Sequence, residues 1–194
     1  MILPMPLAVK PDIGEKIVEV AMRYLELYET KSNAEWDNPY TEEHDLAADQ
    51  LKRGLIESGW KESWPYCASF CEMVWRLAYR EAQAPIALIE QVTVNLTPSV
   101  MKSFGNWNDS ITRDPERGAI AFWQRGNGPY GHAGIVTLPG SLAFSSIEAN
   151  TSADANADDH AQREGQGIFR RRRMLDFRYR DGLHLIGFLP PPRW

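Results

Sequence analysis

Long hydrophobic runs are missing from this sequence. It contains no stretch of about 18 or more apolar residues, the length that a helix needs to span a bilayer. The opening letters MILPMPLAVKPDIG have neither the basic start nor the continuous apolar centre of a secretory signal, and prolines interrupt them. We therefore expect no membrane span and no signal peptide, with synthesis in the cytoplasm.

Cysteine and histidine are scarce. Cys67 and Cys71 are the only cysteines, too few for the multi-bridge framework of a small secreted domain. The four histidines are scattered along the chain, at His44, His132, His160 and His184. Because no run of residues shows the spacing of zinc ligands, we expect neither a metal site nor a cofactor.

Positive charge is in deficit. The formal net charge is -5, whereas a protein that neutralises nucleic-acid phosphates needs a surplus of Lys and Arg. Of the 194 residues, 43% are hydrophobic, which is enough to bury one sizeable core. We expect no nucleic-acid partner and a single domain over residues 1–194, with its core at about 12–189.

Helical patterns occupy the first half of the chain. Apolar residues at helical spacing, capping residues and a first-turn proline predict helices over 12–29, over 44–58, from about Pro65 onward, and over 99–107. The first of these helices starts with Asp12 and Glu15, which resemble a capping box. The polar segment 31–43 carries turn-forming residues, and we interpret it as a surface loop.

Strand patterns follow beyond residue 118. Short segments rich in strand formers, separated by turn residues, predict strands over 118–124, 131–138, 142–150, 167–175 and 183–189. Helices followed by strands are typical of the α+β class, here with N-terminal helices packed on a C-terminal antiparallel sheet of five or six strands. The acidic segment 153–166 predicts a mobile, solvated loop rather than a metal site.

The letters FRRRRMLDFRYR, residues 169–180, form the one basic cluster of the sequence. Alternate side chains of a strand share a face, so only half of the arginines from Arg170 to Arg173 can lie together. We expect a solvated sheet surface with ion pairs to the acidic loop. A second interpretation is attraction to anionic polymers or lipid phosphates.

The letters WPYCASFCEMVW, residues 64–75, place Cys67 in the first turn of the third helix. A helix N-terminus or a neighbouring imidazolium favours the thiolate, which is the nucleophilic form of cysteine. Cys71 lies one turn deeper, where the effect of the helix dipole has faded, so we interpret it as a buried apolar residue. For Cys67 two interpretations stay open, a nucleophile and a small buried hydrophobe.

His132 is the candidate base for such a nucleophile. It starts the strand GHAGIV directly after the glycine-rich turn RGNGPYG, where a side chain can project into a cleft. In the next strand Glu148 and Asn150 are two residues apart and therefore leave the same face. An antiparallel pairing can bring either of them beside His132, where an acid or an amide orients the ring. A strand-end histidine bonded to a backbone carbonyl is the alternative.

In this order, WPYCASFCEMVW, RGAIAFWQRGNGPYGHAGIV and SIEANTS resemble the motifs of the CHAP family. Members of that family are cysteine- and histidine-dependent amidohydrolases and peptidases of papain-like fold that cut bacterial peptidoglycan. The resemblance implies a papain-like fold for this chain, with Cys67 as the nucleophile and His132 as the base. It also implies Glu148 and Asn150 as the orienting pair.

Two positions depart from the family's usual pattern. Tyr66 stands where the family commonly has Trp, which keeps an aromatic residue beside the cysteine. Gly118-Ala119 stands where the family usually has Gly-Asp, so a structural carboxylate is absent from the sequence there.

The resemblance implies acyl transfer on peptidoglycan, by an N-acetylmuramoyl-L-alanine amidase or by a stem-peptide or cross-bridge endopeptidase. Aromatic residues near the motifs are candidates for binding the substrate, namely Trp64, Tyr66, Trp123 and Tyr130. Two alternatives stay open: a catalytically silent papain-like binding module, and a cysteine peptidase that acts on protein amides.

The expected place of action is the cell wall, in the periplasm or outside the cell, after release or export. A phage lysin freed through a membrane hole fits this expectation, and so does an antibacterial effector with an inhibitory immunity protein as its partner. The sequence does not choose between them.

Overall fold

The computed structural model of the protein describes residues 12–152, 154 and 165–194. The helices are α1 (Ile13–Met22), α2 (Leu46–Glu57), α3 (Cys67–Glu81), α4 (Ile86–Asn95) and α5 (Val100–Asn106), followed by a 3₁₀ turn at Asn108–Ser110. The strands are β1 (Tyr28–Lys31), β2 (Glu35–Asp37), β3 (Ile120–Arg125), β4 (Gly131–Leu138), β5 (Ala143–Thr151), β6 (Gly167–Met174) and β7 (Leu183–Leu189). The expected acidic loop at 153–166 and His160 lie largely outside the described residues.

All strands join one antiparallel sheet in the order β2-β1-β6-β5-β4-β3-β7. The described residues thus form a seven-stranded sheet, and the expectation of five or six strands was too low. The additional strands β1 and β2 form a short hairpin that reaches into the segment expected as a surface loop, and Tyr28 pairs it with Gly167 of β6. The hairpin is mostly polar and very short, so no apolar alternation marks it in the sequence.

Helix α1 is shorter than its periodicity predicts. Its first turn is capped by Asp12, whose carboxylate accepts a hydrogen bond from the Gly14 N–H at 2.8 Å. The helix ends at Met22, and Glu26 then adopts a left-handed backbone conformation with φ 64°. Tyr24 lies in the turns after the helix and is still buried. Buried residues at near-helical spacing therefore extended the predicted helix beyond its true end.

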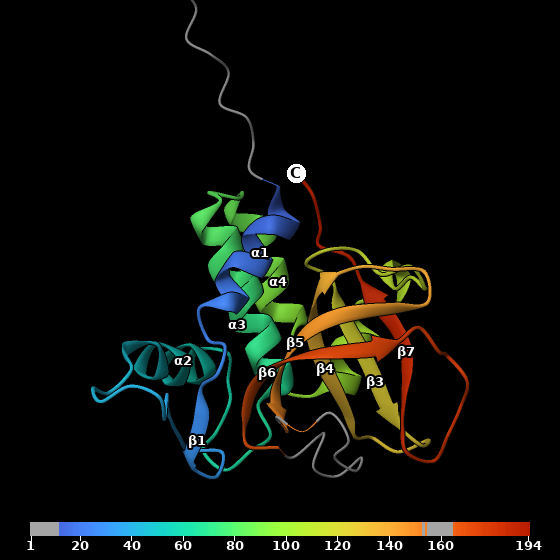
Figure 1. Cartoon of the computed structure of the whole chain (residues 1–194). Helices are drawn as coiled ribbons and strands as arrows, with labels where there is room; N and C mark the ends of the chain where they lie inside the picture. The colour runs from blue at the N-terminus through green and yellow to red at the C-terminus, as the bar shows by residue number, and fades with distance from the viewer. Residues whose placement is uncertain (1–11, 153, 155–164) are drawn as a thin grey trace, which may run out of the picture.

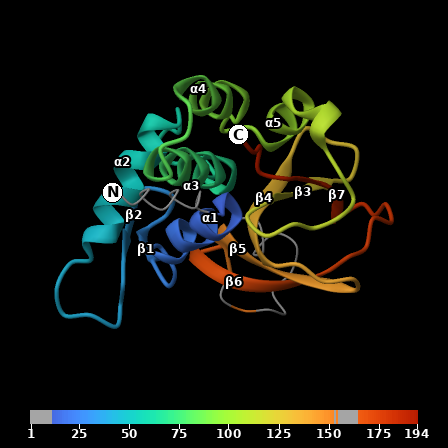
Figure 2. The same ribbon diagram turned by 90° about the horizontal axis from the view of Figure 1, so that it is seen from above.

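Helix α3 is the centre of the helical layer. It packs against α1, α2 and α4 on its sides and against β4 and β5 of the sheet, and Figure 2 shows it between the other helices and the strands. Trp75 in its middle donates a hydrogen bond from Nε1 to the Gly118 carbonyl oxygen at 2.9 Å, which ties the helix to the start of β3. Most of its residues are buried, so the position of Cys67 at its N-terminus is fixed by the core.

The sheet is buried on both faces around β3. Ile120 and Phe122 belong to the large core under the helices, whereas Ala121 and Trp123 belong to a second apolar cluster on the other face. The segment between β6 and β7, which bulges outward beside the strands in Figure 1, covers that second cluster with Phe177 and its neighbours. No helix within the described ranges has the length and apolar character needed to cross a membrane.

Candidate active site

Cys67 lies where helix α3 begins. Tyr66 is the N-cap residue and provides no capping side chain, so the positive end of the helix dipole acts on the first turn without a competing carboxylate or hydroxyl. The Cys67 side chain is buried, yet it lines a cavity of about 380 Å³ that is open to solvent. The thiol is therefore sheltered and still accessible to a substrate.

Cys71, one turn further along α3, lies in a different environment. Its side chain is fully buried, and burial, followed by the charges of Cys67 and Glu148, raises the pKa of the Cys71 thiol well above its ordinary value. A neutral, enclosed thiol is a poor nucleophile. The burial of Cys71 agrees with its interpretation as a buried apolar residue.

His132 is bound on one side by Glu148. The Nε2 atom of the ring lies 2.9 Å from Oε2 of Glu148, and both side chains are fully buried. In the β4–β5 register Glu148 lies opposite Gly134, where a Cβ atom would come within 2.6 Å of the Glu148 Cγ. Because Gly134 has no side chain, the Glu148 side chain has space to reach His132.

The other ring nitrogen of His132 is directed to Cys67. Burial alone lowers the pKa of His132, but the Cys67 sulfur, through its charge and its contact with the ring, and the Glu148 carboxylate outweigh burial and raise this pKa. Nδ1 forms no hydrogen bond with any of the described residues. Because Glu148 already occupies Nε2, the proton that passes between the sulfur and the ring must use Nδ1.

Glu148 is held in turn by two side chains. Arg173 on β6 donates from Nε to Oε1 of Glu148 at 2.8 Å and from Nη2 to Oε2, and Ser146 donates its hydroxyl to Oε1 at 2.7 Å. Burial raises the pKa of Glu148, but the Arg173 guanidinium and then His132 hold this pKa well below its usual range. The carboxylate therefore stays charged inside the protein and keeps the imidazole in one orientation.

Asn150 contacts the segment that directly precedes Cys67. Its Oδ1 accepts a hydrogen bond from the Tyr66 N–H at 3.4 Å, and its backbone has a φ of 56° in the left-handed region. Asn150 thus contacts the residue directly before Cys67, while Glu148 bonds the imidazole. The sequence left open which of the two residues orients His132, and the hydrogen bond to Nε2 belongs to Glu148.

The four aromatic candidates for substrate binding occupy three different places. Trp64 and Tyr130 line the cavity of Cys67 and are 45% and 64% exposed. Trp123 is almost fully buried and lines a second cavity, together with His132. Tyr66 is fully buried: its hydroxyl donates to Oε1 of Glu29 and accepts from Nε1 of Trp36, both at 3.0 Å.

This placement corrects the expectation for Tyr66. Its ring packs against Trp36 of the β1–β2 hairpin, which lies 30 positions earlier in the sequence. Enclosed in this way, the ring cannot touch a substrate in the cavity of Cys67. It anchors the loop before the nucleophile instead.

Arg173 is the functional residue that sequence reasoning missed. The expected alternation is present, because Arg170 and Arg172 are exposed while Arg171 is buried and Arg173 is mostly buried. Arg173 forms an ion pair with Glu148 on β5. The alternation along 170–173 could have indicated this role. An arginine that faces inward needs a buried acceptor for its hydrogen bonds.

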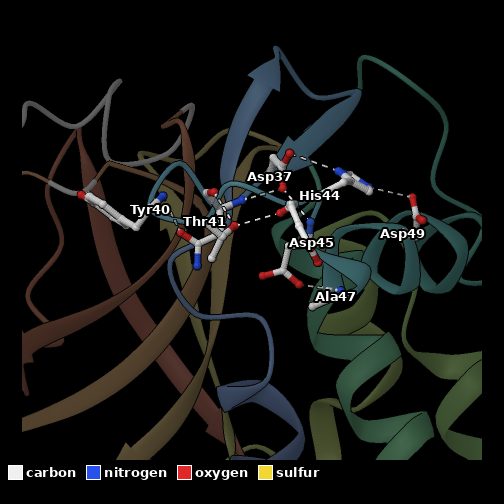
Figure 3. A network of polar contacts seen from close by, with 9 residues as sticks. Asp37, Tyr40, Thr41, His44, Asp45, Ala47 and Asp49 are labelled. Atoms are coloured by element: carbon white, nitrogen blue, oxygen red, sulfur yellow. Dashed lines mark hydrogen bonds and ion pairs between the residues drawn. The ribbon is translucent and has the colours of Figure 1, made fainter.

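A separate polar cluster lies in the connection from β2 to α2 (Figure 3). His44 lies between two carboxylates, with Nδ1 3.1 Å from Oδ2 of Asp37 and Nε2 3.2 Å from Oδ1 of Asp49. The hydrogen bonds to Asp37 and then to Asp49 raise the pKa of His44. Asp37 also accepts from the Asp45 N–H at 2.9 Å, so the cluster joins β2 to the start of α2. In the described part of the chain, no group of three or more His, Cys, Asp or Glu residues is arranged to hold a metal ion.

A cysteine at a helix N-terminus, a histidine on an adjoining strand and a buried carboxylate behind the ring resemble the arrangement of side chains in cysteine-dependent hydrolases. The family comparison agrees: residues 57–150 match the model of the CHAP domain. Residues 57–150 therefore carry a CHAP domain, a type of domain that is generally found in hydrolases of the amidase and peptidase type. The matched segment contains Cys67, His132 and Glu148. Neither the search of curated proteins nor the search of solved structures gave a match.

Proposed function

We propose that this protein hydrolyses an amide bond of bacterial peptidoglycan with Cys67 as the nucleophile. The observation that supports the proposal most strongly is the arrangement of His132, which contacts Cys67 on one side and bonds the ionised Glu148 on the other. CHAP domains act generally on peptidoglycan, which supplies the substrate class. The papain-like character of the fold belongs to the same proposal.

In the proposed reaction the Cys67 thiolate attacks the carbonyl carbon of the amide, and a sulfur–carbon bond forms. The proton on Nδ1 of His132 passes to the amide nitrogen as the carbon–nitrogen bond breaks, so that the amine leaves neutral. Water then attacks the acyl-enzyme, His132 accepts its proton, and the carboxylic acid and the free thiolate are released. Glu148 stays charged throughout and stabilises the imidazolium.

The first turn of α3 supplies a donor for the oxyanion. The backbone N–H of Cys67 lies at the positive end of the helix, and one such donor contributes about 3 kcal/mol to stabilisation of the transition state. Trp64 and Tyr130, exposed on the cavity wall, offer apolar surfaces against which a sugar ring or a peptide side chain can pack.

Digestion of purified peptidoglycan tests the proposal directly. Mass spectrometry of the products identifies the bond, because cleavage between sugar and peptide and cleavage within the stem peptide or cross-bridge give different masses. Cys67→Ala is expected to abolish the new products, and Cys71→Ala, which removes the enclosed cysteine, is the matched control that retains them. Hydrolysis by the Cys67→Ala variant at the wild-type rate would rule out the proposed mechanism.

We also propose that the protein acts on the wall after release or export, as a phage lysin or as an antibacterial effector. The two routes differ in one partner. An effector requires a tight inhibitory protein in the cell that produces it, whereas a lysin purifies alone and lyses permeabilised cells. Copurification from the producing cell, compared with lysis of permeabilised cells by the purified protein, distinguishes them.

A further inference from the structure

The segment that leads to the nucleophile, residues 60–66, contains neither helix nor strand. It lies against the β1–β2 hairpin. The Ser63 N–H donates to the Asn33 carbonyl oxygen at 2.9 Å, and Lys31 forms an ion pair with Glu62 at 3.5 Å. A segment without helix or strand takes its position from such contacts, so the hairpin helps to fix where α3 begins.

The hydroxyl of Tyr66 joins this segment to both strands of the hairpin. It donates to Oε1 of Glu29 on β1 and accepts from Nε1 of Trp36 on β2, both at 3.0 Å. The second oxygen of Glu29 accepts from the Asn33 N–H at 2.8 Å, in the turn between the strands. Tyr66 is fully buried, and burial, followed by the charge of Glu29, raises the pKa of its hydroxyl well above the ordinary value. The hydroxyl therefore keeps its proton for the bond to Glu29.

The indole of Trp36 also contacts the start of the segment. Its ring centroid lies 5.7 Å from that of Trp60 and 5.0 Å from that of Tyr66. Nε1 of Trp60 donates to the carbonyl oxygen of Trp64 at 2.8 Å, and Trp64 lines the cavity of Cys67. The hairpin therefore supports the wall of this cavity as well as the residue before the nucleophile.

The backbone of Tyr66 connects this anchor to α3. Its carbonyl oxygen accepts from the Phe70 N–H at 2.8 Å, which is the first hydrogen bond of the helix, and Cys67 is the next residue. We propose that Glu29 is a positioning residue of the active site, which through the Tyr66 hydroxyl fixes the place of the Cys67 sulfur. The inference rests on the proposed function, because it takes Cys67 as the nucleophile. A displacement of about 1 Å in a catalytic group costs roughly 100-fold in rate, so a buried anchor one residue away affects the reaction.

The rate at which iodoacetamide labels Cys67 tests this inference without turnover of peptidoglycan. Glu29→Ala removes both acceptor oxygens, and Tyr66→Phe removes the hydroxyl and keeps the buried ring. At about pH 6 we expect each variant to be labelled at Cys67 about tenfold more slowly than the wild type, because a displaced sulfur loses part of its contact with the imidazolium that favours the thiolate. The midpoint of labelling against pH should rise in both variants. Glu29→Gln, which keeps one acceptor oxygen, should recover part of the rate.

The direction of the change separates position from charge. Glu29→Ala also removes a negative charge, which through space alone makes the Cys67 thiolate easier to form and its labelling faster. Slower labelling therefore reports a displacement. Glu35→Ala removes the same charge from an exposed position on the other strand of the hairpin, and we expect its labelling rate to match that of the wild type. Labelling of Glu29→Ala at or above the wild-type rate would overturn the proposal.

Two further residues of α3 separate displacement from a loss of the fold. Tyr79, near the other end of the helix, is fully buried, and its hydroxyl donates to the Pro192 carbonyl oxygen at 2.7 Å. Tyr79→Phe therefore loses a comparable hydrogen bond, and we expect it to lower the melting temperature without slowing the labelling of Cys67. Equal slowing in Tyr79→Phe would overturn the proposal. An unfolded variant exposes the enclosed Cys71 as well, so labelling of Cys71 identifies it, and the rate in the milder variant Glu29→Gln then decides.

The failure of the proposed function has a different signature. If Tyr66→Phe and Glu29→Ala are labelled slowly while the wild-type protein cleaves no peptidoglycan, the positioning role stands and the hydrolase assignment fails. If peptidoglycan is cleaved and both variants keep the wild-type labelling rate and kcat, the hydrolase assignment stands and the positioning role is wrong. In the active enzyme, a fall in the kcat of Glu29→Ala at constant KM supports positioning of the nucleophile rather than a role in binding.

Discussion

Oε2 of Glu148 lies 2.9 Å from Nε2 of His132, and neither side chain is exposed to solvent. A charged carboxylate in such a place is costly unless it is paired, and here Arg173 and Ser146 pair it from the other side. The imidazole is therefore held by a group that is itself fixed. Nδ1 is then the ring nitrogen that remains for Cys67. Glu148 orients the ring through Nε2, and Nδ1 is available for proton transfer.

Glu148→Gln removes the charge behind the ring and keeps the size of the side chain. We expect kcat/KM on peptidoglycan to fall by about 100-fold or more, because the imidazolium loses the carboxylate that stabilises it. Glu90→Gln, at an exposed position of α4, is the matched control and is expected to retain wild-type activity. Wild-type kinetics in Glu148→Gln would show that the carboxylate does not act on His132.

The pH dependence of the same variant gives a second measurement. The pKa of His132 is raised to about 9, so the imidazolium is present below that pH and is lost as the pH rises through it. Wild-type activity is therefore expected to decline above about pH 9. In Glu148→Gln the decline should move to lower pH, because one group that raises this pKa is gone. An unchanged alkaline limb in kcat/KM would contradict the assignment of that limb to His132.

Gly134→Ala tests the gap through which Glu148 reaches the ring. The added Cβ would lie 2.6 Å from the Glu148 Cγ, so the carboxylate has to move away from His132 or the strands have to separate. We expect activity to fall at least tenfold, since a small displacement of a catalytic group costs this much or more. Gly105→Ala in α5 is the control, because its Cβ would meet nothing within 4 Å, and thermal unfolding should show it as neutral or slightly stabilised.

Much of the site was predictable because its parts are local. The spacing of apolar residues along α3 placed Cys67 at the start of a buried helix, and the alternation along β5 put Glu148 and Asn150 on one face. Each of these inferences needs only the repeat of side-chain direction along one segment, about 3.6 residues in a helix and 2 in a strand. Antiparallel pairing of neighbouring strands could bring either of them beside His132, and the structure has the register that places Glu148 there.

The unpredicted features depend on contacts between distant segments. The β1–β2 hairpin is too short and too polar to show a strand pattern, and Trp36 on it encloses Tyr66. Alternation along β6 separates Arg173 from the exposed Arg172, but the buried partner of Arg173, Glu148, is set by the pairing of β5 with β6. A pairing of this kind is fixed by the register of β5 with β6, which a single sequence does not specify.

Replacing Arg173 tests whether it positions Glu148. In Arg173→Met the buried carboxylate loses its main counter-charge, so we expect the free energy of unfolding to fall by about 3 kcal/mol. The pKa of Glu148 should rise, because burial is no longer offset, and the acid limb of activity should move to higher pH. Arg173→Lys, which keeps the charge, should restore part of both properties.

Arg170→Met on the same strand is the control for Arg173. Arg170 is exposed, so its replacement should change the free energy of unfolding by less than about 0.5 kcal/mol and leave the pH profile unchanged. Chemical denaturation and the pH profile of kcat/KM are the two measurements. A stability loss in Arg173→Met without any shift of the acid limb would assign Arg173 a purely structural role.

Alkylation with iodoacetamide distinguishes a reactive thiol from an unreactive, buried one. At about pH 6 an ordinary thiol reacts slowly, whereas a thiol held as thiolate beside an imidazolium reacts quickly. We expect Cys67 to be labelled within minutes, since it lines an open cavity and contacts His132, and Cys71 to stay unlabelled because burial raises its pKa. Peptide mass spectrometry after digestion identifies the labelled cysteine, and Glu148→Gln should slow the labelling because the imidazolium is less stable. Slow labelling of Cys67 in the folded wild-type protein would favour a silent binding module over a hydrolase.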